Sequence, residues 1–131
     1  MRSRETILVV HQDEALRAHV CRVLQTEGYR TIPTGHSVGA QWCVERHASD
    51  VDLLLIDLVP PAHQDYHLGI PLGALWAQIP VIFTATGARE DAIRRGLLQP
   101  STPFLQEPFA PRVLARTVRS VLDGWRPLPT M

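Results

Sequence analysis

The sequence predicts a doubly wound α/β fold, in which helices cover both faces of a parallel five-stranded sheet. Short apolar runs alternate along the chain with longer segments whose apolar residues repeat at helical spacing. The run Leu53–Ile56 has no polar interruption, which is typical of a parallel strand that is buried on both faces. Five strand-helix repeats of this size favour right-handed crossovers and therefore one parallel sheet.

The first part of the chain gives clear signals for a strand, a helix and a second strand. Thr6–Val10 is apolar and rich in β-branched residues, so it is expected to be a buried strand. Apolar residues recur at helical spacing over 13–27, and Gly28 stands where a helix C-cap belongs. The run 29–34 contains Pro33, which indicates a strand at an edge of the sheet.

The remaining elements follow the same alternation. Pro71 and Pro111 would lie in the first turns of their helices, where the missing N–H of proline has no helical partner to lose. Gly124 would end the last helix, so residues 1–124 are expected to form one domain and 125–131 a C-terminal tail. The expected elements are a weaker helix at 36–47, the strand at 53–56, a loop at 60–68, a short helix at 71–78, a strand at 80–85, a helix at 89–98, a strand at 102–106 and a helix at 110–122.

Composition indicates one globular domain without a net charge. The chain has 131 residues, of which 45% are hydrophobic, and its 13 basic residues balance 13 acidic ones. This balance disfavours binding to nucleic acid or to an anionic membrane. All the basic residues are arginine and none is lysine. Cys21 and Cys43 lack Cys-x-x-Cys spacing, and no leader peptide or transmembrane run is visible, so we expect a cytoplasmic protein with reduced thiols.

The polar residues that follow the strands define a candidate site. Asp57 comes directly after the buried run, at the strand end where open α/β sheets place their ligands. In the strand order 2-1-3-4-5 the switch point lies between the first and third strands, so residues after the first strand should face Asp57. Ends of the fourth and fifth strands should open onto the same edge. The residues expected there are His11, Gln12, Asp13, Ala85 and Glu107.

Several segments carry a family resemblance when they are taken in order. These are Ile7–Val10 followed by polar residues, Gly28-Tyr29, Leu54–Asp57 with Pro61, Pro80–Ile82, and Glu107–Phe109. Together they resemble a response-regulator receiver domain over residues 6 to about 123. The resemblance implies a flavodoxin-like (βα)5 fold and a role in two-component or phosphorelay signal transduction. It also implies that a histidine kinase passes a phosphoryl group to Asp57, with help from Mg²⁺ on an acidic pair, a lysine after the fifth strand and a hydroxyl ending the fourth.

The chain departs from that pattern at most of the positions that would handle a phosphoryl group. His11 and Gln12 stand in place of the acidic pair, so Asp13 and Asp57 remain as weak candidates for Mg²⁺ and no other cofactor is expected. Glu107 stands in place of the lysine. Ala85 takes the place of the hydroxyl residue, with Thr84 and Thr86 on either side. Phe104 takes the aromatic position associated with conformational readout, where packing on the last helix is an equal alternative.

We therefore expect an atypical receiver that keeps the fold and acts as a protein-interaction module, without enzymatic activity or catalytic residues. One alternative is a receiver that is still phosphorylated on Asp57. Another is a small flavodoxin-like enzyme or cofactor protein, although no glycine-rich phosphate loop and no nucleophile-base pair are evident.

Arginines on the last two helices predict an interaction surface. A histidine kinase, another signalling protein or a second copy of the chain could bind there, the last through the fourth helix, the fifth strand and the fifth helix. A solvated basic face is the alternative. His63 and His67 have metal-ligand spacing if their segment is helical, but solvated loop histidines are the commoner case. The arginines are Arg94, Arg95, Arg112, Arg116 and Arg119.

Overall fold

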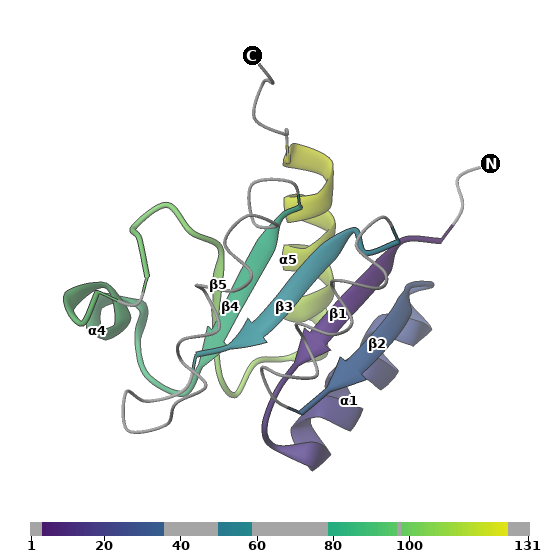
Figure 1. Ribbon diagram of the computed structural model, residues 1–131, viewed down its shortest axis with the longest axis horizontal. Coiled ribbons are helices and arrows are strands. Elements are labelled where there is room, and N and C mark those ends of the chain that lie inside the picture. Colours follow the sequence, from purple (N-terminus) through teal and green to yellow (C-terminus); the bar gives the residue numbers. More distant parts are fainter. Residues whose placement is uncertain (1–3, 36–49, 59–78, 97, 126–131) are drawn as a thin grey trace.

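Five parallel strands form one sheet in the order β2-β1-β3-β4-β5 (Figure 1). The computed structural model describes residues 4–35, 50–58, 79–96 and 98–125. Both the predicted strand order and the five predicted strands are confirmed. The strands are β1 (Thr6–Val10), β2 (Arg30–Thr34), β3 (Leu53–Asp57), β4 (Val81–Ala85) and β5 (Phe104–Gln106).

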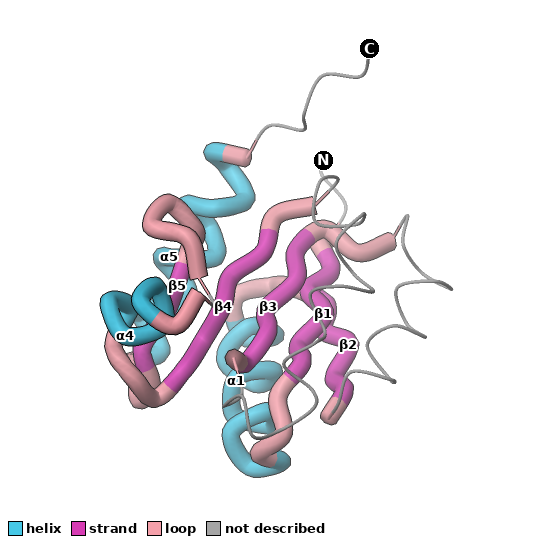
Figure 2. The backbone as a smooth tube through the Cα atoms, turned by 60° about the vertical axis from the view of Figure 1, so that its left-hand side comes forward, coloured by secondary structure: helices cyan, strands magenta, loops and turns pink. Residues whose placement is uncertain are grey.

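The described helices cover the two faces of the sheet. They are α1 (Glu14–Thr26), α4 (Arg89–Arg94) and α5 (Pro111–Gly124). Figure 1 shows α1 and α5 together behind the sheet, and Figure 2 shows α4 standing away from α1. No helix of the described ranges is long and apolar enough to cross a membrane.

Alternation along the strands divides the core into two layers. Successive strand residues point to opposite faces of a sheet, so Ile7 and Val9 face α1 and α5, whereas Leu8 and Val10 face the α4 side. The first layer also contains Val20, Leu24, Leu53, Leu55, Ile82, Leu105, Leu114 and Val118. The second contains Leu54, Ile56, Phe83, Ala92 and Leu98. Because both faces are covered, the strands lack the polar alternation of a half-exposed sheet.

Local residues fix the ends of the elements. Asp13 is the N-cap of α1, and its Oδ1 accepts a hydrogen bond from the Leu16 N–H at 3.0 Å. Gly28, at φ +97°, takes the left-handed conformation just beyond this helix. Pro33 lies opposite Val9 in the edge strand β2, as its missing N–H requires.

Some predicted boundaries are wrong. The fourth helix ends at Arg94 and not at residue 98, because Gly96 turns left-handed at φ +77° and its N–H bonds the Ile93 carbonyl. The fifth strand begins at Phe104 and not at residue 102, and the last helix continues to Gly124. The predicted helices at 36–47 and 71–78 and the predicted loop at 60–68 lie outside the described residues.

Adjacent residues on α5 should respond very differently to truncation. Leu114 is 1% exposed in the α1–α5 layer, so Leu114→Ala should lower the free energy of unfolding by about 2–5 kcal/mol. Val113 is 42% exposed, and Val113→Ala should change the free energy of unfolding by less than about 0.5 kcal/mol. Urea denaturation of both variants measures the difference. Similar losses in the two variants would contradict the assigned face of α5.

Candidate functional site

The hydrogen-bond ladders of the sheet continue one residue past three strands. The His11 N–H donates to the Thr34 carbonyl at 3.1 Å. The N–H groups of Leu58 and Glu107 donate to β4 carbonyls, each at 2.7 Å. The backbone is therefore held at the carboxyl edge of the sheet, where the sequence places the candidate site. This explains why side chains from β1, β3 and β5 meet there.

His11, Asp57 and Glu107 form a compact cluster at this edge, which we call the His11 cluster. The Nε2 atom of His11 lies 2.9 Å from Glu107 Oε2 and 3.7 Å from Asp57 Oδ1. One ligand-type atom from each of the three residues lies within 4.8 Å of the other two. His11 and Glu107 are buried, and the Asp57 side chain is 16% exposed.

The backbone around His11 sets the tautomer of its ring. The Asp13 N–H donates to Nδ1 at 3.0 Å, so Nδ1 is an acceptor in the neutral ring. The ring proton then lies on Nε2, which donates to Glu107. Arg17 also holds the backbone of His11, since its Nη1 donates to the His11 carbonyl at 2.7 Å.

Burial and neighbouring charges change the acidity of the cluster. The pKa of Asp57 is raised from 3.8 to about 6, chiefly by burial; Glu107 and Asp13 also raise it, whereas His11 and the nearby Thr84 hydroxyl lower it. For His11, burial lowers the pKa, but the hydrogen bond to Glu107 and the negative charges of Asp57, Glu107 and Asp13 outweigh burial and raise it above 6.5.

Two threonines, and not Ala85, share the sheet face of Asp57. Thr84 pairs with Asp57 in the β3–β4 register, and Ala85 points to the opposite face. The Thr84 hydroxyl is buried, in a residue that is 2% exposed, and it has no well-formed hydrogen bond to any described residue. Thr86, two residues on, lines the hollow above the cluster. A hydroxyl is therefore available beside Asp57 despite the alanine.

A hollow of about 620 Å³ opens over the His11 cluster. It brings together the residues that the sequence predicts after the first and fifth strands with Asp57. Gln12 and Asp13 belong to its lining with the cluster itself, whereas Thr84 lies buried behind Asp57. Sequence reasoning did not single out the apolar part of the lining, which is Leu16, Leu58 and Pro108.

The donors around Asp57 do not fit Mg²⁺. This ion prefers oxygen ligands in near-octahedral geometry. The donor that faces both Asp57 and Glu107 is instead an imidazole nitrogen. The Asp13 carboxylate caps α1 through its bond to the Leu16 N–H. Weak binding of Mg²⁺ at Asp13 and Asp57 remains a prediction. The imidazole donor and the capping role of Asp13 give it a geometric reason.

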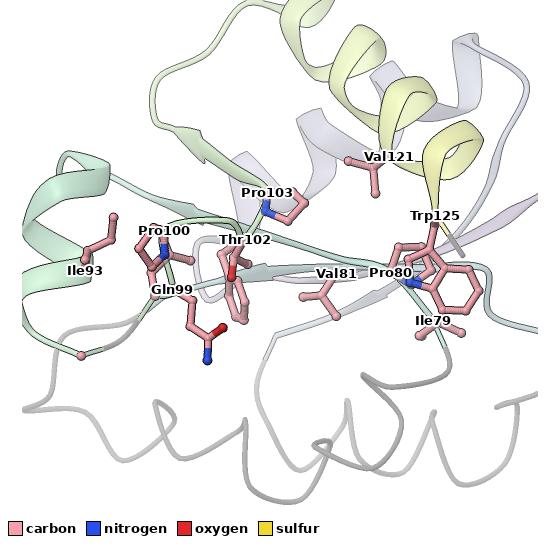
Figure 3. A pocket seen from close by; sticks show the side chains of 13 residues that line it. Ile79, Pro80, Val81, Ile93, Gln99, Pro100, Thr102, Pro103, Val121 and Trp125 are labelled. Atoms are coloured by element: carbon pink, nitrogen blue, oxygen red, sulfur yellow. The ribbon is translucent and has the colours of Figure 1, made fainter. Parts of the chain in front are cut away.

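A second hollow, of about 730 Å³, lies near the opposite end of β4 (Figure 3). Its described lining is mainly apolar and includes Val81, Ile93, Val121 and Trp125. None of the predicted site residues belongs to this lining. We therefore place the candidate chemistry at the His11 cluster alone.

The predicted surface arginines fall into three groups. The exposed side chains of Arg94 and Arg95, at the end of α4, both pair with Asp91, at 3.0 and 3.2 Å. Arg112 and Arg116 are exposed on α5, and no ion pair joins them to the described part of the chain. These two remain candidates for contact with another molecule.

Arg119 differs from the other predicted surface arginines. Its guanidinium pairs with Glu5 at 2.9 Å and with Asp123 at 2.8 Å, and it donates to the Tyr29 hydroxyl at 3.2 Å. It therefore ties α5 to the segment before β1. The helical spacing of the arginines in the sequence did not reveal this structural role.

Phe104 is half-buried and packs against the α4-side core. The Arg89 guanidinium lies 5.5 Å from the centre of its ring. Arg89 also donates to the carbonyls of Pro100 and Thr102, at 3.1 and 2.8 Å. Phe104 thus packs toward α4, and not on the last helix as the packing alternative had it.

We expect the stabilising contribution of the His11 cluster to fall as the pH rises. The folded pKa of Asp57, about 6, exceeds 3.8, so its contribution is complete below pH 3.8 and is lost as the pH rises through 6. The raised pKa of His11 acts in the same direction, with a contribution that is complete below pH 6.5 and lost at higher pH.

Carbon-detected NMR with a chelator present should give an Asp57 midpoint near pH 6. Relative to the parent chain, Asp57→Asn should gain about 1–3 kcal/mol in free energy of unfolding between about pH 4 and 7. Glu90→Gln, which changes an exposed acid on α4, should gain little. A midpoint near pH 4 would contradict the desolvated environment of Asp57.

Comparison with known proteins gives one consistent answer. No family model matches the chain. An uncharacterized transcriptional regulatory protein, YbdJ of Bacillus subtilis, is 29% identical over 117 residues, or 89% of this chain. The sensor kinase CckA of Brucella abortus is 32% identical over 119 residues, or 90% of this chain. The chain spans only 50% of the first protein's length and 12% of the second's.

Solved structures share the same architecture. A response regulator receiver protein from Sinorhizobium medicae superposes with a TM-score of 0.77 at 17% identity, over 93% of this chain and 97% of the other. That likeness shows the fold, and the two curated relatives add a relationship in sequence along nearly the whole chain. With its sheet order of 2-1-3-4-5 and an aspartate ending β3, the chain has the fold of response-regulator receiver domains.

Proposed function

We propose that this chain is an atypical receiver of two-component signalling that acts by binding another protein, with Asp57 closed into the His11 cluster. The observation that carries the proposal is the 2.9 Å contact between His11 and Glu107 beside Asp57. In the receiver pattern that the sequence resembles, carboxylates follow the first strand and a lysine follows the fifth. Here a base follows β1 and an acid follows β5, so the polarity of the pair is reversed.

This reversal works against phosphoryl transfer to Asp57. A phosphoryl group brings further negative charge, which catalysts of this reaction offset with cations. Glu107 adds a negative charge within 4.8 Å of Asp57. Among the described residues, the base that faces Asp57 is His11, and it already bonds Glu107. The negative charge of Glu107 and the engagement of His11 with Glu107 therefore both favour a receiver that does not depend on phosphorylation.

The proposed partner surface consists of α4, β5 and α5. On α5 its exposed residues include Arg112, Arg116 and Val113. The relationship to a sensor kinase supports a histidine kinase as one class of partner, and a second copy of the chain is another. The buried free thiol of Cys21 suits the reducing cytoplasm, which we propose as the location.

Phosphorylation can be tested by restoring the charges of the receiver pattern. We expect the parent chain to form little acylphosphate with acetyl phosphate and Mg²⁺. The triple variant His11→Asp, Gln12→Asp, Glu107→Lys should form more, because it returns ligands for Mg²⁺ and a cation to the site. Intact-mass spectrometry measures the yield.

Adding Asp57→Asn to the triple variant provides the control and should abolish the adduct. Stoichiometric labelling of the parent chain on Asp57 would establish the alternative, a receiver that is still phosphorylated.

The partner surface can be tested separately from Asp57. Reversing the charges of Arg112 and Arg116 to glutamate should abolish self-association, or capture of a histidine kinase, whereas Asp57→Asn should leave either nearly unchanged. Arg119 is left intact because it stabilises the fold through Glu5. Arg22→Glu, at an exposed position on α1, is the matched control.

Sedimentation equilibrium measures self-association, and surface plasmon resonance measures kinase binding. Loss of binding in Asp57→Asn with retention in the arginine variant would identify a phosphorylation switch and overturn the proposal.

A further inference from the structure

We propose that the His11 cluster binds a divalent transition-metal ion such as Zn²⁺ through His11 Nε2 and the carboxylates of Asp57 and Glu107. This site goes beyond the proposed interaction role and does not depend on it. It also differs from a magnesium site, because a nitrogen ligand replaces the acidic pair after β1 and a carboxylate replaces the lysine after β5.

The spacing of the donor atoms fits a tetrahedral ion. Ligands about 2.1 Å from a tetrahedral Zn²⁺ lie about 3.4 Å from one another. The separations of His11 Nε2 from Glu107 Oε2 and from Asp57 Oδ1, 2.9 and 3.7 Å, bracket that value. The three donors come from β1, β3 and β5, so small side-chain rotations suffice to equalise the distances. The hollow above the cluster leaves room for a water as fourth ligand.

The charge of the cluster favours a cation. Even with a protonated imidazole, two ionised carboxylates leave the buried site with one net negative charge. A divalent ion bound to the neutral imidazole balances both carboxylates. Neutralisation matters here because His11 and Glu107 are buried, where unbalanced charge is costly.

Thr84 is a buried polar group that can support a ligand of the site. Its hydroxyl is buried on the same sheet face as Asp57 and has no well-formed hydrogen bond to the described residues. Buried polar groups in folded proteins are almost always satisfied. A hydroxyl in this position can donate to the Asp57 carboxylate or to a water on a bound ion, which fixes the orientation of that ligand.

The donor set also selects the class of metal. An imidazole with two carboxylates suits borderline ions of the first transition row, and affinity for such ligands rises toward the end of that row. Mg²⁺ binds nitrogen ligands poorly and demands near-octahedral oxygen geometry. The chain should therefore discriminate strongly in favour of Zn²⁺ over Mg²⁺.

Metal binding has a signature at Asp13. A neutral imidazole that binds metal through Nε2 carries its proton on Nδ1. The Asp13 N–H can then no longer donate to Nδ1, a bond that is 3.0 Å long without metal. The Asp13 amide resonance should therefore shift when the site fills. Binding at any exposed histidine would leave it unchanged.

The test uses the full chain, freed of metal with a chelator and titrated with ZnCl₂. Isothermal titration calorimetry should show one tight site that about 10 mM Mg²⁺ does not block, and NMR should show shifts of the Asp13 amide and the His11 ring. His11→Gln, Asp57→Asn and Glu107→Gln should each weaken this site at least about 10-fold. His19→Gln, at an exposed position on α1, should not.

Circular dichroism confirms that each variant is folded, and three separate ligand variants keep the test decisive if one of them is not. Zinc binding that persists equally in all folded ligand variants would place the ion on other histidines and overturn the proposal. Absence of the Asp13 shift in the parent chain, or equal affinity for Mg²⁺ and Zn²⁺, would also overturn it.

Discussion

The hydrogen bond between His11 and Glu107 is the interaction on which the character of the candidate site depends. It spans the carboxyl edge of the sheet from β1 to β5, and Asp57 on β3 lies beside it. Two carboxylates in so small a buried volume repel each other, and a shared imidazole relieves that repulsion. Glu107 and Asp57 thus compete for the same imidazole of His11.

The sequence was sufficient for the sheet, because Leu53–Ile56 and Thr6–Val10 are short, uniformly apolar runs, as parallel strands covered on both faces are. The strand pattern also predicted that Asp57 lies at the carboxyl edge of the sheet, opposite the residues that follow the first strand. The end of α4 could not be predicted in this way, because Leu97 and Leu98 continue the apolar repeat in the sequence. The helix ends because Gly96 takes a left-handed conformation. Ala85 suggested a lost hydroxyl, but its neighbour Thr84 pairs with Asp57.

Arg119 shows what a helical repeat leaves undetermined. It follows Arg112 and Arg116 at helical spacing, and the pattern groups all three. Its partners, Glu5 and Tyr29, come from the opposite end of the sequence, and only the folded chain brings them to α5. The same helix therefore uses one arginine for its own attachment and leaves two for other molecules. Long-range pairing of this kind leaves no trace in local periodicity.

The continued ladders at His11, Leu58 and Glu107 have a kinetic consequence. Their backbone N–H groups are bonded to neighbouring strands, so the cluster cannot separate unless the edge of the sheet frays. Local opening there should be as rare as in the strands themselves, and exchange of these amide protons with solvent correspondingly slow. Any ion or proton that enters the site must then arrive through the hollow by rotation of side chains, while the backbone stays in place.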